Sequence, residues 1–190
     1  MVLRARIPAL IAAAMAVGTG ACSIERAPSG RPGGAAAPAA DSAVSAEVYA
    51  ALRLYYARLT ARDWKVLAQS FWPHATITAI MGAAPGVHGV GRGVPGEVET
   101  ISVEEAIRRA AVMRDCPASF VASLTRANVV SYGPLADAWV TYRVTCGVTH
   151  DSVTVHYGID AIHLMRHGGE WRIAGLTFTH ELPGIPLGRP

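Results

Sequence analysis

The first candidate for chemistry in this 190-residue chain is a single acid, Asp160, in the middle of an apolar, strand-like run. The run "VTVHYGIDAIHLMRHGGEWRI" covers residues 153–173. An acid in such a run is either a solvated residue on an outer face or a carboxyl group placed inside a cavity. Strand alternation puts Asp160 on one face with His156 and Ile162. The pattern does not say which face is inward.

The histidines and glycines do not form a metal or cofactor site. His163 and His167 are four residues apart, but in an extended strand they lie roughly 13 Å apart, too far to share one ion. A formal G-x-G-x-x-G begins at Gly91. Pro95 and an acidic stretch stand where a dinucleotide loop needs a helix. We therefore predict neither a metal nor a cofactor.

The first residues, "MVLRARIPALIAAAMAVGTGAC", have the pattern of a secretory signal peptide: two arginines, a short apolar core and small residues. The apolar core is too short to span a bilayer of roughly 30 Å. The ending Thr19-Gly20-Ala21-Cys22 resembles the lipobox of bacterial lipoproteins, in which the cysteine is lipidated. We predict a signal peptide over residues 1–21 and a lipid-anchored protein of the bacterial cell envelope, facing the periplasm or the outer surface. An ordinary secreted protein is the alternative.

The rest of the chain reads as a tether, one domain and a tail. Residues 22–43 are rich in Gly, Pro, Ala and Ser without an apolar period, which predicts a flexible tether. Residues 44–183 are one domain's worth of chain, and residues 184–190 form a tail. Of 17 Lys and Arg residues, Arg4 and Arg6 lie in the signal peptide, so 15 remain against 14 Asp and Glu. This balance, without a basic stripe bearing aromatic residues, argues against nucleic acid as a partner.

Two cysteines besides the lipidated one invite a disulfide in an exported protein. Cys116 and Cys146 flank one predicted hairpin, whose turn near Pro134 places Cys146 opposite about Ser123. At about 3.3 Å per residue, Cys116 is then too far away to bond unless the chain bends back beside it. A Cys116–Cys146 disulfide and two buried free thiols remain as alternatives.

The elements that position these groups follow from periodicity. Residues 44–62 repeat apolar groups at helical spacing. Asp63 is a typical N-cap for a short second helix, "WKVLAQSF". Ser102 with Glu105 forms a capping box ahead of a third helix. Strand alternation is found over residues 75–80, 119–131, 137–150, 151–167 and 170–182. Helices followed by hairpin-linked strands predict an α+β fold with an antiparallel sheet packed on helices.

Two stretches together resemble the nuclear transport factor 2-like superfamily. "LYYARLTARDWKVLAQSFWPHATI" is similar to its opening helices and first strand, and "GIDAIHLMRHGGEWRIAGL" is similar to its last hairpin. The resemblance extends over residues 44–182. It implies a cone-shaped, curved antiparallel sheet on three N-terminal helices around an apolar pocket, the cystatin-like α+β roll. The superfamily includes ketosteroid isomerases, SnoaL-type cyclases and non-catalytic binding modules, so the fold alone does not fix function.

The ketosteroid isomerase pattern places two donors in this sequence. The resemblance puts Tyr55 at the first-helix tyrosine and Asp160 at the late-strand acid that form the oxyanion hole. In an apolar cavity such an acid can stay neutral and donate a hydrogen bond to developing negative charge. The general base of that pattern corresponds to Ala79, which cannot take a proton. His74 stands where relatives often have an acid and is the substitute base.

These observations predict a SnoaL-like, lipid-anchored protein that binds a small, mostly apolar molecule in its cone without catalysis. One alternative is an isomerase, cyclase or hydratase that uses Tyr55 and Asp160 as donors and His74 as base, which requires all three to meet in one cavity. The other is an assembly module. The expected partners are the membrane through Cys22, a small-molecule ligand and a second copy of the chain, since relatives often dimerise through the open sheet face. The aromatic residues expected to line the pocket are Trp64, Phe71, Trp72, Tyr142 and Tyr157.

Overall fold

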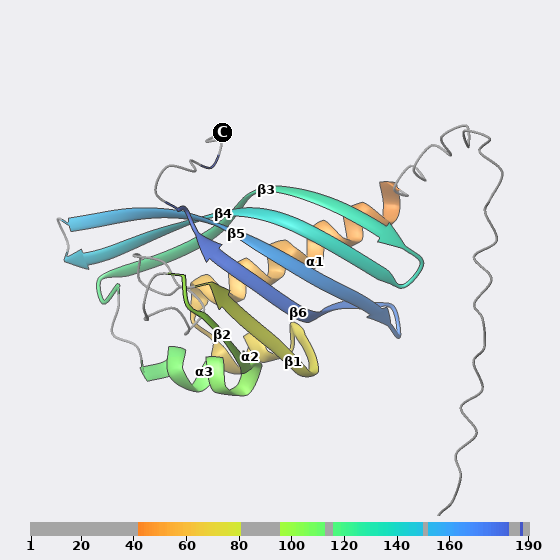
Figure 1. Cartoon of the computed structure of the whole chain (residues 1–190), viewed down its shortest axis with the longest axis horizontal. Coiled ribbons are helices and arrows are strands. Elements are labelled where there is room, and N and C mark those ends of the chain that lie inside the picture. The colour runs from red at the N-terminus through yellow and green to blue at the C-terminus, as the bar shows by residue number, and fades with distance from the viewer. Residues whose placement is uncertain (1–41, 81–95, 113–115, 150–151, 183–186, 188–190) are drawn as a thin grey trace, which may run out of the picture. The chain divides into compact units, whose positions relative to one another are not determined.

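The computed structural model describes residues 42–80, 96–112, 116–149, 152–182 and 187, all within one compact unit, Ala36–Pro190. Its elements in chain order are α1 (Ser42–Ala61), α2 (Trp64–Ala68), β1 (Phe71–Ile80), β2 (Val98–Ser102), α3 (Val103–Val112), β3 (Ser119–Tyr132), β4 (Leu135–Thr149), β5 (Ser152–His167) and β6 (Glu170–His180). Figure 1 shows α1 lying along the inside of the curved sheet. No helix within these described ranges is long and apolar enough to cross a membrane.

The six strands form one curved, unclosed sheet in the order β2-β1-β6-β5-β4-β3. The four long hairpin-linked strands are antiparallel, as predicted. β1 pairs in parallel with β6, so the sheet is mixed and the prediction of a purely antiparallel sheet is wrong. The parallel pair arises because the chain returns to β1 only after the whole β3–β6 meander is complete. The predicted α+β class, with a curved sheet packed on N-terminal helices, is confirmed.

Both predicted helix caps are confirmed. The Asp63 carboxylate accepts a hydrogen bond from the Val66 amide at 3.2 Å, and the Ser102 hydroxyl accepts one from the Glu105 amide at 3.2 Å. These side chains satisfy amides that a helix leaves unpaired at its start.

The start of the sheet differs from the prediction. α2 ends at Ala68, and β1 begins at Phe71 rather than at residue 75. Pro73 therefore lies inside a strand. The register of β1 against β6 shifts between Phe71 and Thr76, and His74 has a φ of 65°. An irregularity of this kind is where a strand tolerates a proline, because the proline donates no ladder hydrogen bond.

The structure joins Cys116 to Cys146 by a disulfide, with Cα atoms 4.8 Å apart. The distance expected from the sequence was too long because Ser123 was placed opposite Cys146, whereas in the structure Phe120 lies opposite Cys146. The backbone also bends at Cys116, which has a φ of 57°. Free thiols at these two positions are therefore excluded.

The core lies between α1 and the concave side of the sheet. Helix α1 contributes a buried stripe with helical spacing, formed by Val48, Leu52, Tyr55, Tyr56 and Leu59. Alternate residues of β4, β5 and β6 face this stripe and are buried, while the residues between them face outward. We call these two sides the inner face and the outer face of the sheet.

Candidate functional site

Asp160 lies on the inner face. Gly158, Asp160 and Ile162 of β5 are all buried, and Asp160 has no exposed surface (0%). Its neighbours in the sheet register are Val140 of β4 and Phe178 of β6, which are also buried. The acid in the apolar strand is therefore an interior group and not a solvated residue.

Tyr56 is the hydrogen-bond partner of Asp160, with the Tyr56 hydroxyl donating to Asp160 Oδ2. Tyr55, the tyrosine indicated by the family resemblance, is rotated by about 100° around the helix. Its ring packs edge-on against Phe71, with ring centroids 5.7 Å apart. It also contacts Tyr56, at 5.1 Å between centroids. The structure therefore places both tyrosines close to Asp160, and the Tyr56 hydroxyl donates a hydrogen bond to it.

Tyr142 and His180 form a second buried pair on the inner face. Tyr142 lies opposite Gly158 in the register of β4 and β5, and the hydroxyl end of its ring occupies the space where a Cβ of residue 158 would lie. Its hydroxyl donates to the Thr179 carbonyl at 3.4 Å and lies 3.2 Å from Nδ1 of His180. The missing side chain at Gly158 thus allows a residue of β4 to reach β6.

The three inner tyrosines stay protonated at neutral pH. Burial raises the pKa of Tyr55, Tyr56 and Tyr142 well above the ordinary value, and the nearby charge of Asp160 raises each pKa further. For Tyr56 the hydrogen bond to Asp160 adds to the rise of its pKa. These hydroxyls are therefore permanent hydrogen-bond donors beside an interior carboxyl group.

His180 is the site residue that the sequence analysis missed. Within the described ranges, it and Asp160 are the buried polar or charged side chains outside the aromatic core, at 3% and 0% exposure. Its ring lies 5.9 Å from the Phe178 ring, and Phe178 pairs with Asp160. Because Phe178 and His180 are two residues apart on β6, both side chains face the same interior as Asp160.

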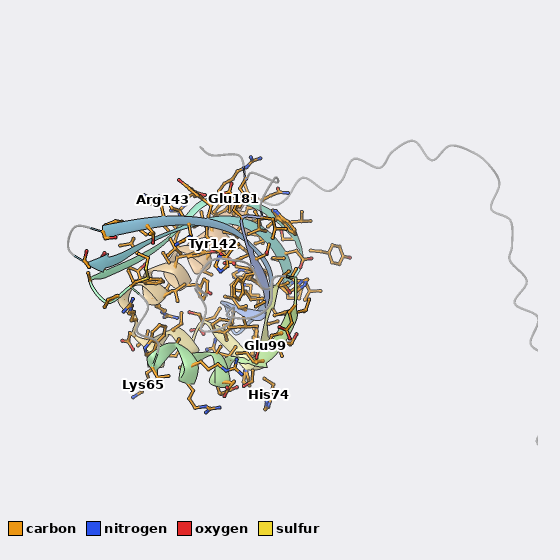
Figure 2. All side chains as sticks on the ribbon, turned by 60° about the vertical axis from the view of Figure 1, so that its left-hand side comes forward. Lys65, His74, Glu99, Tyr142, Arg143 and Glu181 are labelled. Carbon is orange, nitrogen blue, oxygen red and sulfur yellow. A yellow bond between two sulfur atoms is a disulfide. The ribbon has the colours of Figure 1, made fainter. Side chains whose placement is uncertain are left out.

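His74 does not join this cluster. It is exposed, lies in the irregular part of β1, and stands at the rim of the domain away from Tyr142 (Figure 2). The predicted meeting of His74, Tyr55 and Asp160 in one cavity does not occur, because the positive φ at His74 turns its side chain outward. The structure therefore does not bring His74 to Asp160, and a role of His74 as the base stays a prediction.

The predicted pocket aromatics divide into two groups. Trp64 and Phe71 line a small cavity with Tyr55 at the helical end of the interior, and Tyr142 is fully buried. This cavity measures about 20 Å³, which is room for about one water molecule. Trp72 and Tyr157 do not line the interior. The Trp72 indole donates to the Met165 carbonyl, and Tyr157 lies opposite Arg143 on the outer face.

The remaining predictions concern a metal site, His163, the lipid anchor and the glycine motif. No group of three or more His, Cys, Asp or Glu residues in the described part of the chain could hold a metal ion. His163 pairs with Asp137 on the outer face. Cys22 and Gly91, and with them the predicted lipid anchor and the glycine motif, lie outside the described residues.

No protein-family model and no curated protein matches the chain. Solved structures do share its fold. A proposed scytalone dehydratase from Novosphingobium aromaticivorans DSM 12444 is 8% identical, with 73% of this chain and 85% of that chain covered and a TM-score of 0.57. A proposed dehydratase of the NTF2-like family from Streptomyces avermitilis is 14% identical, with 74% and 98% covered and a TM-score of 0.56. A hexachlorocyclohexane dehydrochlorinase from Novosphingobium barchaimii LL02 is 15% identical, with 78% and 97% covered and a TM-score of 0.55.

These structures define the class of the domain. The chain has a nuclear transport factor 2-like fold, in which a curved, unclosed sheet packs against N-terminal helices. At such low identity the similarity shows the fold alone, so the function must be argued from the interior side chains.

Proposed function

We propose that the protein is a lipid-anchored protein of the bacterial cell envelope whose SnoaL-like domain binds a small, mostly apolar molecule in its cone without catalysis. The observation that carries this proposal is the fully buried Asp160, held by Tyr56 and close to Tyr142. Ligand sites typically combine a mainly apolar lining with a few fixed polar groups. A hydroxyl or carbonyl oxygen of the ligand would bind to this cluster, and its apolar body would contact the surrounding core.

The proposed position of the ligand follows from the polar groups. The cavity of about 20 Å³ beside Trp64 and Phe71 is too small for an organic molecule. The ligand is instead proposed to meet Asp160, on the sheet row that contains Ala79, Phe178, Asp160 and Val140, which are consecutive partners on β1, β6, β5 and β4.

The same row supports binding without catalysis. Ala79, the position of the base in the ketosteroid isomerase pattern, lies two strands from Asp160, which is about 10 Å at the usual strand spacing. Its methyl group cannot accept a proton, and His74 faces away from the row. The tyrosine hydroxyls and Asp160 can hold a ligand oxygen, whereas the base position is an alanine and His74 lies away from the row.

A co-purification experiment tests the ligand. The full-length gene is expressed in a bacterial host, the protein is purified as the cell leaves it, and native mass spectrometry detects bound small molecules. We expect a bound organic molecule in the wild type, strongly reduced occupancy in Asp160→Asn and Tyr56→Phe, and unchanged occupancy in the outer-face control Asp137→Asn. Equal occupancy in all four proteins, or none in the wild type, would contradict binding in the cone.

The lipid anchor rests on the sequence alone and has its own test. Mass spectrometry of the amino terminus should find a mature chain that begins at a diacylated Cys22, and Cys22→Ala should move the protein from the membrane fraction to the soluble fraction. Cleavage at another position, with Cys22 unmodified, would instead support an ordinary secreted protein.

A second candidate function is favoured by His180. This imidazole is buried and lies 3.2 Å from the Tyr142 hydroxyl, so it could serve as the base in place of His74. Three of the similar structures are named as two dehydratases and a dehydrochlorinase, which all catalyse eliminations. An enzyme of the isomerase, cyclase or hydratase type predicts that the co-purified molecule is converted on incubation and that His180→Gln abolishes the conversion.

We also propose that the domain forms a homodimer through the outer face. That face exposes apolar side chains, of which Val130, Tyr132, Leu135 and Trp139, near the β3–β4 turn, form the outer-face patch, while Val153 and Val155 lie near the start of β5. Their exposed fractions run from 43% at Val155 to 82% at Tyr132. Extended apolar patches of this kind are uncommon on monomeric proteins and mark interaction surfaces.

A further inference from the structure

A groove outside the Tyr56–Asp160 cluster lies between α1 and the hairpin that joins β5 to β6. Its volume is about 370 Å³, large enough for an organic molecule of modest size. It is lined by Ala51, Leu54, Arg58, Gln69, Ser70, Leu164, Glu170, Trp171, Arg172 and Ile173. None of these residues belongs to the proposed cone site, so the groove requires its own explanation.

Arg58 is the distinctive group of the groove. It is half-buried, and its Nη1 donates a hydrogen bond of 2.8 Å to the Ser70 hydroxyl. Its Nε is buried and has no hydrogen-bond partner among the described residues, and within them no carboxylate pairs with the guanidinium. A buried donor without a partner costs folding free energy. A ligand in the groove would meet the uncompensated charge of the guanidinium rather than this covered nitrogen.

The second arginine of the groove is already neutralised. Arg172 donates from Nε and Nη2 to the same oxygen of Glu170, at 3.2 and 2.6 Å. Its guanidinium also stacks over the Trp72 ring at 5.5 Å. Because Glu170 cancels Arg172, the groove keeps a single uncompensated positive charge, that of Arg58.

The remaining walls suit an apolar body. Leu164, Trp171 and Ile173 present buried apolar side chains, and Leu54 adds an exposed one at the opening. The turn that carries Ser70 is fixed to the sheet, since the Ile173 amide donates to the Ser70 carbonyl at 2.8 Å. The hydroxyl that orients Arg58 is therefore held in place before any ligand binds.

We propose that this groove binds a small organic monoanion, a carboxylate with an apolar body. Ser70 accepts from Nη1 of the Arg58 guanidinium, and protein atoms cover Nε, so Nη2 is the nitrogen left to donate to a ligand. A carboxylate oxygen that accepts from Nη2 forms a charge-assisted hydrogen bond with the guanidinium. One positive charge matches one carboxylate, and the apolar walls contact the hydrocarbon part. This site is independent of ligand binding in the cone.

The test compares two probes that differ only in charge, 2-naphthoate and its neutral amide, 2-naphthamide. Each is titrated into the full-length protein, purified as the cell leaves it, and followed by amide and indole signals in nitrogen–proton NMR spectra. We expect 2-naphthoate to shift the signals of Ser70, Ile173 and the Trp171 indole, and 2-naphthamide to bind at least tenfold more weakly. Arg58→Gln should weaken 2-naphthoate binding at least tenfold. Arg53→Gln, which removes an exposed arginine from the same helix, should leave it unchanged.

Three outcomes would overturn the proposal: no 2-naphthoate binding, equal binding of the amide, or equal loss in Arg53→Gln, which would indicate a general charge effect. If Arg58→Gln does not fold, Ala51→Phe provides a second variant, because it fills the groove and keeps the arginine. It should abolish 2-naphthoate binding. Asp160→Asn should leave 2-naphthoate binding unchanged, so failure of the cone site and failure of the groove are distinguished.

Discussion

Each face of the central strands has an aspartate that pairs with an aromatic side chain, but one aspartate is buried and the other is exposed to solvent. On the inner face Asp160 has 0% exposure and accepts a hydrogen bond from Tyr56. On the outer face Asp137 pairs with His163, and both side chains are 70% exposed. A solvated pair of this kind contributes about 0–1 kcal/mol to stability. A buried carboxyl group must be satisfied by its neighbours or it destabilises the fold.

The difference shows how strand parity, rather than residue type, makes an acid a candidate for function. Successive residues of a strand point to opposite faces, so a shift of one position would exchange the surroundings of the two acids. The inner face adds the crossing Tyr142 ring and the buried His180, which have no counterpart near the outer Asp137–His163 pair in the described residues. The following four predictions compare the two faces directly.

The largest effect is expected from a methyl group added to each face. A Cβ at Gly158 would overlap the Tyr142 ring and lie 2.5 Å from the Thr179 carbonyl oxygen. At Gly175, on the outer face, the nearest atom would be His163 Cδ2 at 4.0 Å. We expect Gly158→Ala to lower the free energy of unfolding by about 3 kcal/mol, and Gly175→Ala to change it by less than about 1 kcal/mol, in the stabilising direction. Urea denaturation of both variants measures this, and equal losses would remove the distinction between the faces.

Removing each acid gives the second comparison. Asp160→Ala leaves the Tyr56 hydroxyl buried without its acceptor, which costs about 1–3 kcal/mol. Asp137→Ala removes a solvated partner of His163 and should change stability by less than about 0.5 kcal/mol. The free energies of unfolding of the two variants at neutral pH measure this difference. A neutral or stabilising Asp160→Ala would mean that the interior carboxyl group is a stability cost retained for ligand binding.

Most of the fold could be predicted from local patterns. The long strands alternate over many residues, and Asp63 and Ser102 cap their helices through contacts three residues away. The parallel pairing of β1 with β6 was not predictable, because it joins segments about a hundred residues apart that carry no local signal. β2 was missed for a related reason: it is a five-residue edge strand whose pairing with β1 defines it.

The site was predictable only in part. Alternation grouped the residues of β5 correctly but could not say which group faces the helix. Tyr55 and Tyr56 are adjacent, and both fit a helical stripe with Leu52, so the pattern could not choose between them. His180 lies near the end of the last strand, and its role depends on a tyrosine that crosses β5 above Gly158. Gly158 was the available signal, because a glycine inside a strand usually marks a close approach of other atoms.

The third comparison uses alkaline pH, because tyrosines occupy both environments. The pKa of Tyr55, Tyr56 and Tyr142 is raised in the folded state, chiefly by burial, whereas unfolding returns it to about 10. Above pH 10 the unfolded chain therefore releases protons first, and stability falls by up to about 1.4 kcal/mol per pH unit for each inner tyrosine.

Tyrosinate absorbance and circular dichroism, followed together from pH 9 to 12, measure the effect. The three inner tyrosines, of six in the chain, should ionise only as the protein unfolds. Tyr142→Phe should make stability fall less steeply with pH, because it removes one of the three raised pKa values. Ionisation of all six tyrosines before any loss of structure would show that water reaches the inner face.

The smallest effect on stability, and the sharpest on assembly, is expected at Trp139 in the outer-face patch. Its side chain is 59% exposed, so Trp139→Ser should change the stability of a single domain by less than about 0.5 kcal/mol. If two copies meet through this face, the substitution removes a large aromatic contact from the centre of the interface, where such residues carry most of the binding energy. Light scattering after gel filtration should then show half the wild-type mass, whereas Arg53→Gln on α1 should keep the wild-type mass. A wild-type protein that is already monomeric at high concentration would leave the outer face as solvent-exposed surface and would confine function to the interior and the groove.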